Sequence, residues 1–274
     1  MVDADLSIGA CRLWVLQDGW LTDDGGSVFG RVPKAIWSSL VSSRDNQIEL
    51  PVLGYLIESG QELILVDSGC GTKEELDPQL KRPDGDLLVS LARAGFDPEQ
   101  VTIVLNTHLH TDHAGGNTRR HNGSILPTFP QATYVIQERE WASARSPHPL
   151  HADLYHAPDF EPLQASGNLR LLNGDSQLTD AVGCRLYPGH TPGHQIVVIS
   201  SAGQRGAIVG DLATLRWQLA DPLWTCPYDL LPAINVDSKR KVLEWLDAGG
   251  SPMVAFGHDQ PLFWPIATDS GHLT

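Results

Sequence analysis

Four side chains that can bind a metal ion lie within the six positions 108–113, in the run NTHLHTDHAGGN. They are His108, His110, Asp112 and His113, and they follow an apolar, β-branched stretch at 101–106 that predicts a strand. Imidazole and carboxylate groups are ligands that zinc, manganese and iron(II) accept. Residues two apart on a strand point the same way, so His108 and His110 can hold one ion while the following turn aims Asp112 and His113 at a second. The chain is therefore expected to fold so that a strand ends at a metal site.

Three further candidate ligands occur downstream, each after a short apolar stretch that ends in a turn marked by glycine or proline. They are His190 in YPGHTPGH, Asp211 in AIVGDLA and His258 in VAFGHDQ. Strand ends from both halves of a chain can converge on one edge of a layered α/β fold. A closed structural zinc site needs only four ligands, so this larger set favours two ions with an open position for water and substrate. A histidine-rich surface loop would not explain the recurrence. His194, close to His190, is expected to support the site without binding an ion.

Together with the acidic VDSG turn at Asp67, these motifs resemble the metallo-β-lactamase superfamily over nearly the whole chain. The resemblance implies an α/β fold, a four-layer αββα sandwich. It also implies three ligands for each ion and one that bridges them: His108, His110 and His190 for the first, Asp112, His113 and His258 for the second, and Asp211 between them. Asp67 is expected to accept a hydrogen bond from a ligand imidazole and so to orient it.

Two further segments resemble one bacterial branch of that superfamily: residues 28–37 (VFGRVPKAIW) and 217–222 (WQLADP). This branch includes N-acyl homoserine lactonases and methyl parathion hydrolase-like enzymes. Its lactonases carry a tyrosine three residues after the bridging aspartate, where it hydrogen-bonds the substrate carbonyl. Thr214 occupies that position here, which weakens the expectation of homoserine-lactone specificity. Tyr228 and Tyr155 are the candidates to replace the tyrosine from a loop.

The reaction implied by the resemblance is hydrolysis by a hydroxide held between two divalent ions, with zinc preferred over manganese, cobalt or iron. Asp112 would face that water and pass its proton to the leaving group, which makes it the candidate catalytic residue. The expected substrate is a small neutral ester or lactone, with a quorum-quenching-type lactone preferred. An organophosphate triester or a glyoxalase II-like thioester would use the same hydroxide, so both stay open. The alternatives outside hydrolases are a mononuclear-iron persulfide dioxygenase, with ligands His108, His190 and Asp211 alone, and a non-catalytic metal-binding scaffold.

Charge and hydropathy limit the partners of the chain. The formal net charge is −14, and the one basic cluster is the short run 239–241. A nucleic-acid partner is not expected, because phosphate backbones require a positive surface. The sequence has no apolar stretch near the roughly 18 residues of a membrane span, and its acidic N-terminus does not resemble a signal peptide. We therefore expect a cytoplasmic protein with a small-molecule substrate. A homodimer, common in the resembling branch, is the expected form if the chain self-associates.

The cysteines suggest neither disulfides nor thiolate metal sites. Cys11, Cys70, Cys184 and Cys226 lie far apart in the sequence and form no C-x-x-C pair. A reduced protein with free thiols is the simplest expectation.

The chain is expected to form one domain over 1–274, built from two halves that each contain strands and helices. Apolar or alternating stretches predict strands near 12–16, 52–58, 62–67, 101–106, 133–136, 185–187, 196–200, 207–210 and 253–256. Helical spacing predicts helices at 86–95, from about Gln137, and at 238–248 with Asp237 or Ser238 as N-cap.

Residues 144–167, rich in proline and histidine, are expected to form a cap or loop insert over the site. The histidines of this segment, His148, His151 and His156, are expected at the surface. Three tryptophans near the ligand motifs, Trp217, Trp224 and Trp264, would either line an apolar pocket, with the segment around Phe29 as its other wall, or simply pack.

Overall fold

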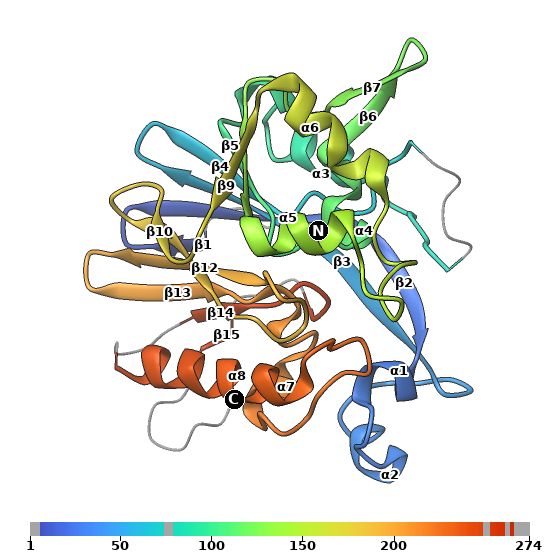
Figure 1. The fold of residues 1–274 in the computed structure, drawn as a ribbon. Helices are drawn as coiled ribbons and strands as arrows, with labels where there is room; N and C mark the ends of the chain where they lie inside the picture. Colours follow the sequence, from blue (N-terminus) through green and yellow to red (C-terminus); the bar gives the residue numbers. More distant parts are fainter. Residues whose placement is uncertain (1–5, 74–78, 249–252, 261–263, 266–274) are drawn as a thin grey trace.

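The chain folds into four layers, with two sheets in the middle and helices on both outer faces (Figure 1). This computed structural model describes residues 6–73, 79–248, 253–260 and 264–265. The predicted αββα arrangement is confirmed. The ligand motifs follow strands of both sheets.

The first sheet has the strand order β1-β2-β3-β4-β5-β8-β9. Its first four strands are antiparallel neighbours, and β4, β5, β8 and β9 run parallel to one another. The strands are β1 (Leu6–Ile8), β2 (Cys11–Asp24), β3 (Gln47–Ser59), β4 (Glu62–Val66), β5 (Ile103–Leu105), β8 (Thr133–Gln137) and β9 (Leu169–Leu172).

The second sheet has the order β10-β11-β12-β13-β14-β15 and is antiparallel except for the parallel pair β13 and β14. Its strands are β10 (Ser176–Gln177), β11 (Val182–Leu186), β12 (Gln195–Ser201), β13 (Gln204–Ile208), β14 (Met253–Ala255) and β15 (Trp264–Pro265). A separate hairpin pairs β6 (Thr118–His121) with β7 (Ser124–Pro127).

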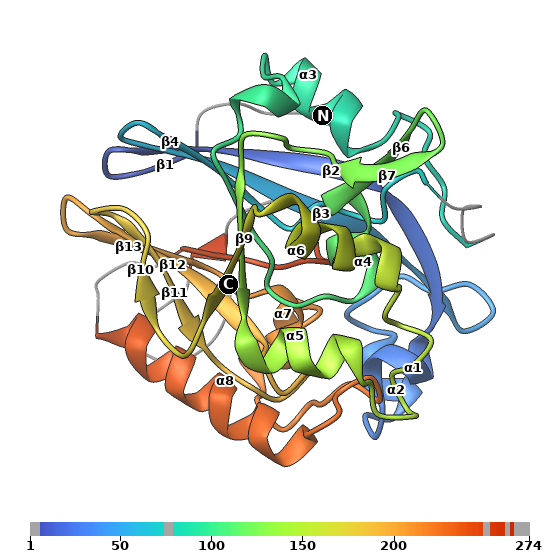
Figure 2. The same ribbon diagram turned by 45° about the horizontal axis from the view of Figure 1, so that its top comes forward.

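Helices cover the two outer faces, and the two views in Figures 1 and 2 agree on their places. The helices over the first sheet are α3 (Leu87–Arg93), α5 (Glu138–Arg145) and α6 (Glu161–Ser166), and those over the second are α7 (Arg216–Ala220) and α8 (Pro232–Asp247). The short helices α1 (Gly25–Phe29) and α2 (Lys34–Trp37) connect β2 to β3. The helix α4 (Thr111–Ala114) begins within residues 108–113, which carry four predicted ligands and are called the ligand run below. The 3-10 turns are η1 (Pro98–Gln100), η2 (Gly115–Asn117), η3 (Ala157–Asp159) and η4 (Gly210–Leu212).

Three hydrophobic layers follow from strands that are apolar on both faces. In β4, Leu63 and Leu65 pack under the helices of the first sheet, whereas Ile64 and Val66 point into the layer between the sheets. The alternation repeats in β12, at positions 196–199, between the sheet interface and α8. Successive residues of a strand face opposite sides, so a continuous apolar run is what a strand buried on both faces requires. Each fully buried aliphatic side chain contributes about 1.5–3 kcal/mol to folding.

The predicted core strands exist, but several boundaries were wrong. β2 and β3 continue well beyond the predicted ranges 12–16 and 52–58 and carry α1 and α2 at their far end. The helix at 86–95 is confirmed, since Asp86 caps it by accepting from the Val89 N–H at 3.0 Å. α8 begins at Pro232, so the predicted N-cap at Asp237 or Ser238 was wrong. Ser238 lies inside the helix, where its hydroxyl donates to the carbonyl of Pro188 at 2.6 Å.

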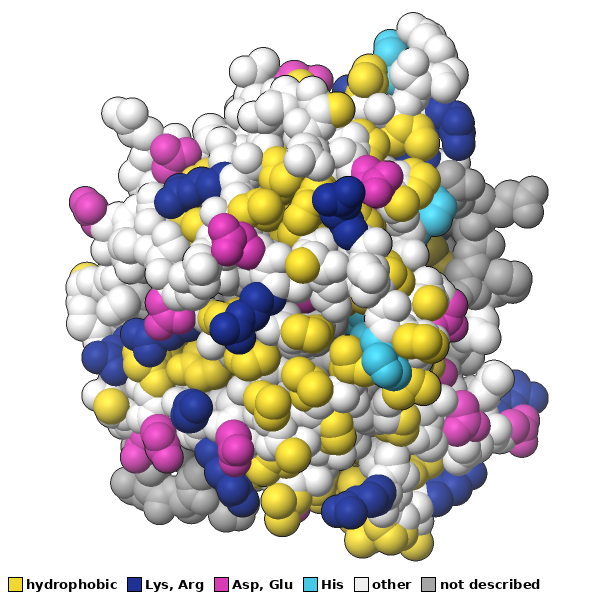
Figure 3. Space-filling model, in the orientation of Figure 1, with side chains coloured by type: hydrophobic (Ala, Val, Ile, Leu, Met, Phe, Trp, Pro, Cys, Tyr) yellow, Lys and Arg dark blue, Asp and Glu magenta, His cyan; other side chains and the backbone are white. Residues whose placement is uncertain are grey.

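All four cysteines are free. In the described part of the chain, no helix has both the length and the apolar character needed to cross a membrane. On the face drawn in Figure 3, lysine and arginine side chains alternate with acidic, hydrophobic and uncharged ones.

Candidate metal centre

All seven predicted ligand residues lie together where strand ends of the two sheets meet. Four of them follow the first sheet and three follow the second. In chain order they are His108 and His110 after β5, Asp112 and His113 on α4, His190 after β11, Asp211 in η4 after β13, and His258 after β14.

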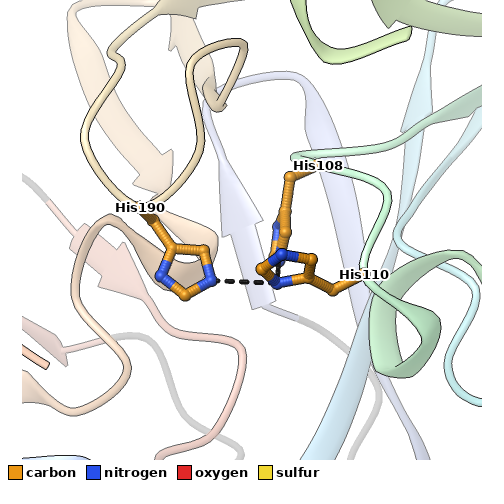
Figure 4. Close-up of side chains that lie close together, drawn as sticks. All are labelled: His108, His110 and His190. Carbon is orange, nitrogen blue, oxygen red and sulfur yellow. Dashed lines mark hydrogen bonds between the residues drawn. The ribbon is translucent and has the colours of Figure 1, made fainter. Parts of the chain in front are cut away.

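Three imidazoles form the first group of donors. The Nδ1 atom of His110 lies 3.0 Å from Nε2 of His108 and 3.1 Å from Nε2 of His190. Figure 4 shows His190 reaching from its loop toward the His108–His110 pair. Zinc binds imidazole nitrogen at about 2.0–2.1 Å, so two tetrahedral ligands of one ion lie roughly 3.3 Å apart. The spacing in this group therefore fits ligands of a single ion.

The second group contains two imidazoles and a carboxylate. The Nε2 atoms of His113 and His258 are 3.1 Å apart, and Oδ2 of Asp112 lies 3.2 Å from Nε2 of His258. The three donor atoms lie within 4.8 Å of one another. Imidazole and carboxylate together suit zinc, manganese or iron(II).

Asp211 lies between the two groups and turns one oxygen to each. Its Oδ1 atom is 3.5 Å from Nε2 of His113 and 3.6 Å from Nε2 of His258, whereas Oδ2 is 3.5 Å from Nε2 of His190. Oδ1 is buried and has no hydrogen-bond partner among the described residues. Buried polar atoms are nearly always satisfied. A divalent cation would satisfy this oxygen, so the donor set fits such an ion.

Each of the five imidazoles is held through the nitrogen that faces away from the cluster. The partners are Thr107 Oγ1 for His108 at 3.1 Å, His151 Nδ1 for His110 at 3.3 Å, Asp67 Oδ2 for His113 at 2.9 Å, Asp229 Oδ1 for His190 at 3.1 Å and the Pro51 carbonyl for His258 at 2.9 Å. Such contacts fix the orientation and tautomer of a metal-binding histidine.

Asp67 contacts Nδ1 of His113, a predicted ligand, as expected of an acceptor that orients such an imidazole. The same carboxylate accepts from Thr107, through the backbone N–H at 2.7 Å and the hydroxyl at 2.8 Å. Asp67 is buried with φ of +55°, a conformation uncommon outside glycine. One carboxylate thus connects the turn after β4 to both ends of the ligand run.

Two glycines let the turn after β4 pack against the ligand run. A Cβ atom at Gly115 would lie 2.1 Å from the carbonyl oxygen of Cys70, and one at Gly116 would lie 2.1 Å from that of Ser68. Any larger residue would push the two backbones apart and displace His113.

Sequence reasoning missed the roles of three residues that support the predicted ligands. Asp229 and His151 come from loops after α7 and α5, and Glu140 is buried in α5. Oε1 of Glu140 accepts from the Leu109 N–H and the Tyr155 hydroxyl, each at 3.0 Å, and Oε2 accepts from Thr191. Glu140 thereby links the loop of the HLHTDH run to the loop that carries His190.

The expected surface position of His151 was wrong. His148 is exposed and His156 is half-buried, but His151 is only 3% exposed because the segment folds back onto the ligand run. The carbonyl of Leu154 accepts from the Thr111 N–H at 2.9 Å, which fixes the segment to α4. Residues 144–167 include η3 and α6 and are not wholly irregular. Their expected action as a cap stays a prediction.

The two carboxylates of the cluster are held ionised. Burial alone would raise the pKa of Asp112 and of Asp211, but the neighbouring His113 and His258 lower both pKa values well below the usual range of a carboxyl group. Carboxylate anions among imidazoles are the charge arrangement that a divalent cation requires.

His108 and His110 remain neutral, because burial lowers the pKa of each well below its ordinary value. A neutral imidazole can present a lone pair to a metal.

His194 is fully buried beside His108 and His110, with its ring centroid 5.3 Å from that of His108, and burial lowers its pKa to about 3. Its ring nitrogens have no hydrogen-bond partner among the described residues, and its expected supporting role stays a prediction.

A cavity of about 340 Å³ opens onto the donor groups. Its walls include Leu21, Val28, Leu50, Leu80, Leu154, Thr214 and Tyr228, together with predicted ligand residues such as Asp112. Of the two candidate tyrosines, Tyr228 therefore reaches the cavity, whereas Tyr155 bonds Glu140 beneath it.

Trp217 and Trp224 pack against a hydrophobic cluster and are not among the described residues that line this cavity. Trp224 meets Phe29 edge-on at 6.1 Å, Phe29 stacks on Trp37 at 5.1 Å, and Trp217 packs against the same cluster. The side chain of Trp264 lies outside the described residues. Phe29 is fully buried, and its neighbour Val28 forms the cavity wall.

Comparison with known sequences supports the assignment from geometry. The family model described as "Metallo-beta-lactamase superfamily" matches residues 48–258. An N-acyl homoserine lactonase of Bacillus thuringiensis is 28% identical over 227 residues, which cover 77% of this chain and 82% of that protein. The N-acyl homoserine lactonase AttM of Azorhizobium caulinodans is 28% identical over 247 residues, covering 79% and 84%.

Solved structures show the same fold. A probable metal-dependent hydrolase from Staphylococcus aureus superposes with a TM-score of 0.88 at 26% identity and covers 98% of this chain and 96% of its own. AidC, a dizinc quorum-quenching lactonase in complex with a product, superposes with a TM-score of 0.81 at 23% identity, covering 100% and 96%. The chain belongs to the metallo-beta-lactamase superfamily and is a metal-dependent hydrolase.

Proposed function

We propose that this hydrolase is dinuclear and opens small, neutral lactones of the N-acyl homoserine type. In the proposed centre, His108, His110 and His190 would hold one ion, Asp112, His113 and His258 would hold the other, and Asp211 would offer one oxygen to each. The observation that carries the proposal is the position of Asp211, with Oδ1 toward His113 and His258 and Oδ2 toward His190. A carboxylate that divides its oxygens between two donor groups suits two cations better than one.

Two divalent ions, with zinc preferred, would supply Lewis acidity and a water molecule with a pKa near neutrality. A mononuclear iron centre built from His108, His190 and Asp211 would leave Asp112 and His258 without a metal, although both are aimed at the same cluster.

Asp112 is the proposed catalytic residue among the protein's own groups. Oδ2 lies 3.2 Å from Nε2 of His258, and the side chain, 30% exposed, lines the cavity. Because its pKa is held low, Asp112 is present as a carboxylate that can take a proton from water and pass it to the leaving alkoxide of the opened ring.

The cavity favours a substrate without negative charge. Among its described lining residues, Lys73 is the one lysine or arginine, and it pairs with Asp159 at 2.6 Å. Asp23 and Asp153 also line the wall. A glutathione thioester or another anionic substrate would therefore meet no unpaired lysine or arginine among the described wall residues, whereas the leucine-lined wall suits an acyl chain.

Tyr228 is the proposed hydrogen-bond donor to the substrate carbonyl. Thr214 lines the cavity but is shorter than the tyrosine found there in the resembling lactonases. Burial, reinforced by the nearby Asp23 carboxylate, raises the pKa of Tyr228 to about 12, so its hydroxyl keeps its proton.

The test is a substrate panel on the metal-loaded enzyme: N-acyl homoserine lactones of several chain lengths, simple lactones, an aryl phosphotriester, a glutathione thioester and a cephalosporin. We expect ring opening of N-acyl homoserine lactones to have the highest kcat/KM. A preference for the phosphotriester or the thioester would refute the proposed substrate but not the hydrolytic centre. Oxygen uptake with a persulfide would refute both.

A further inference from the structure

His110 has a different kind of anchor from the other four imidazoles of the cluster. The partners of those four are oxygen atoms: the Thr107 hydroxyl, the Asp67 and Asp229 carboxylates, and the Pro51 carbonyl. The partner of His110 is a nitrogen, Nδ1 of His151, at 3.3 Å from its Nε2. An oxygen acceptor has no tautomer, but an imidazole can accept only through its unprotonated nitrogen.

The proton positions along this contact follow from the geometry. Nδ1 of His110 faces the first donor group, so it must carry the lone pair if His110 is to bind an ion. The proton of His110 is then on Nε2 and is donated to Nδ1 of His151. The proton of His151 must accordingly be on its own Nε2.

The surroundings protect this contact from water. His151 is 3% exposed, and its ring centroid lies 5.0 Å from that of His110 at an interplanar angle of 71°. The segment that carries it is fixed to α4 through the Leu154 carbonyl and the Thr111 N–H. A buried hydrogen bond whose partner cannot be replaced by water is costly to break.

We propose that His151 is a positioning residue, which accepts from Nε2 of His110 and keeps the Nδ1 lone pair of His110 directed at the first donor group. The inference rests on the proposed function, because it takes His110 as a ligand. It gives the 144–167 segment a role beyond covering the cavity, since this segment completes the metal site. Residues that orient metal ligands typically change metal affinity by about 10–100-fold when they are removed.

Two substitutions separate the acceptor from the volume of the side chain. In His151→Asn, the amide oxygen stands the same number of bonds from Cα as Nδ1 of histidine and can still accept. His151→Leu fills similar space without an acceptor. His148→Leu is the matched control, because His148 is exposed on the same segment.

The measurement is zinc affinity of the metal-depleted, refilled protein, by competition with a chromophoric chelator. We expect His151→Leu to weaken one of two zinc sites by about 10–100-fold. His151→Asn should stay close to wild type, and His148→Leu should be unchanged. A second readout is the ¹⁵N shift of the His110 ring in the metal-free protein, which reports whether Nε2 carries the proton. Nε2 of His110 should carry the proton in wild type and in His151→Asn. In His151→Leu, both tautomers of His110 should appear.

The outcomes distinguish this inference from the proposed function. If wild type binds two zinc ions and His151→Leu binds them as tightly, the inference alone is overturned. It is also overturned if Asn and Leu weaken binding equally and lower the melting temperature of the metal-free protein equally, because His151 would then act only by packing. If wild type does not bind two ions, the dinuclear proposal fails and the inference fails with it.

Discussion

Asp229→Asn should damage the metal centre although Asp229 is not a proposed ligand. Three donors converge on the Asp229 carboxylate: Nδ1 of His190 at 3.1 Å and the Asn235 amide at 3.3 Å on Oδ1, and the Cys226 N–H at 2.9 Å on Oδ2. An ionised carboxylate is an acceptor at both oxygens, but an amide is an acceptor at only one. Whichever way the asparagine turns, its NH₂ group faces a donor.

The two orientations of the amide have different costs. With NH₂ toward Cys226, a buried backbone N–H loses its partner, which destabilises the fold by about 1–3 kcal/mol. With NH₂ toward His190, Nδ1 must become the acceptor, and the proton moves to the Nε2 atom that faces the cluster. His190 then presents no lone pair, and zinc affinity should fall by about 10–100-fold, or about 1.4–2.8 kcal/mol.

The assay combines zinc competition with thermal unfolding of the metal-free protein, and Asp221→Asn is the control because Asp221 is an exposed carboxylate of the same loop. We expect Asp229→Asn to lose zinc affinity, melting temperature or both, and the control to lose neither. If Asp229→Asn kept wild-type values for both, the reasoning on tautomers would be refuted.

Three further predictions concern the cavity, the core and the metal. Tyr228→Phe should lower kcat/KM for lactone opening by about 2- to 10-fold, the worth of one neutral hydrogen bond, with metal content unchanged; unaltered kinetics would exclude Tyr228 as the carbonyl donor. Burial lowers the pKa of Lys239 to about 8, so between pH 8 and the usual lysine pKa the folded state loses a proton that the unfolded state keeps. The free energy of unfolding of wild type, measured in urea, should therefore rise with pH over that range relative to that of Lys239→Met. A difference between the two that does not change with pH would contradict a lowered pKa for Lys239. Chelation should lower the melting temperature, because the ionised Asp112 and Asp211 would lose their counter-ions; equal melting temperatures with and without metal would show that no ion binds the native state preferentially.

The sequence was informative where a few neighbouring positions determine the geometry. A strand followed by a turn is enough to place His108 and Asp112 near one another, and the two-sided burial of β4 follows from its continuous apolar run. Asp86 shows the same for a helix start, because its capping bond spans only three residues.

Contacts between distant segments could not be predicted in this way. Nε2 of His110 meets a residue 41 positions away, and Nδ1 of His190 meets one 39 positions away. No periodicity or motif marks His151 or Asp229 as the partners, since their roles arise only when the loops pack together. The tryptophans illustrate the same limit, because a bulky aromatic side chain is equally suited to a pocket wall and to a core. For Trp224, only the packing against Phe29 of α1 shows that it belongs to the core.

Metal stoichiometry tests the central claim most directly. The protein would be purified without added chelator, refilled with zinc, dialysed and analysed by elemental mass spectrometry against protein concentration, with Asp211→Ala as the paired variant. Since Asp211 turns one oxygen to each donor group, the account predicts two ions per chain in wild type and fewer than two in Asp211→Ala. A wild-type protein that holds a single iron, or an Asp211→Ala variant that retains two tightly bound ions, would contradict it.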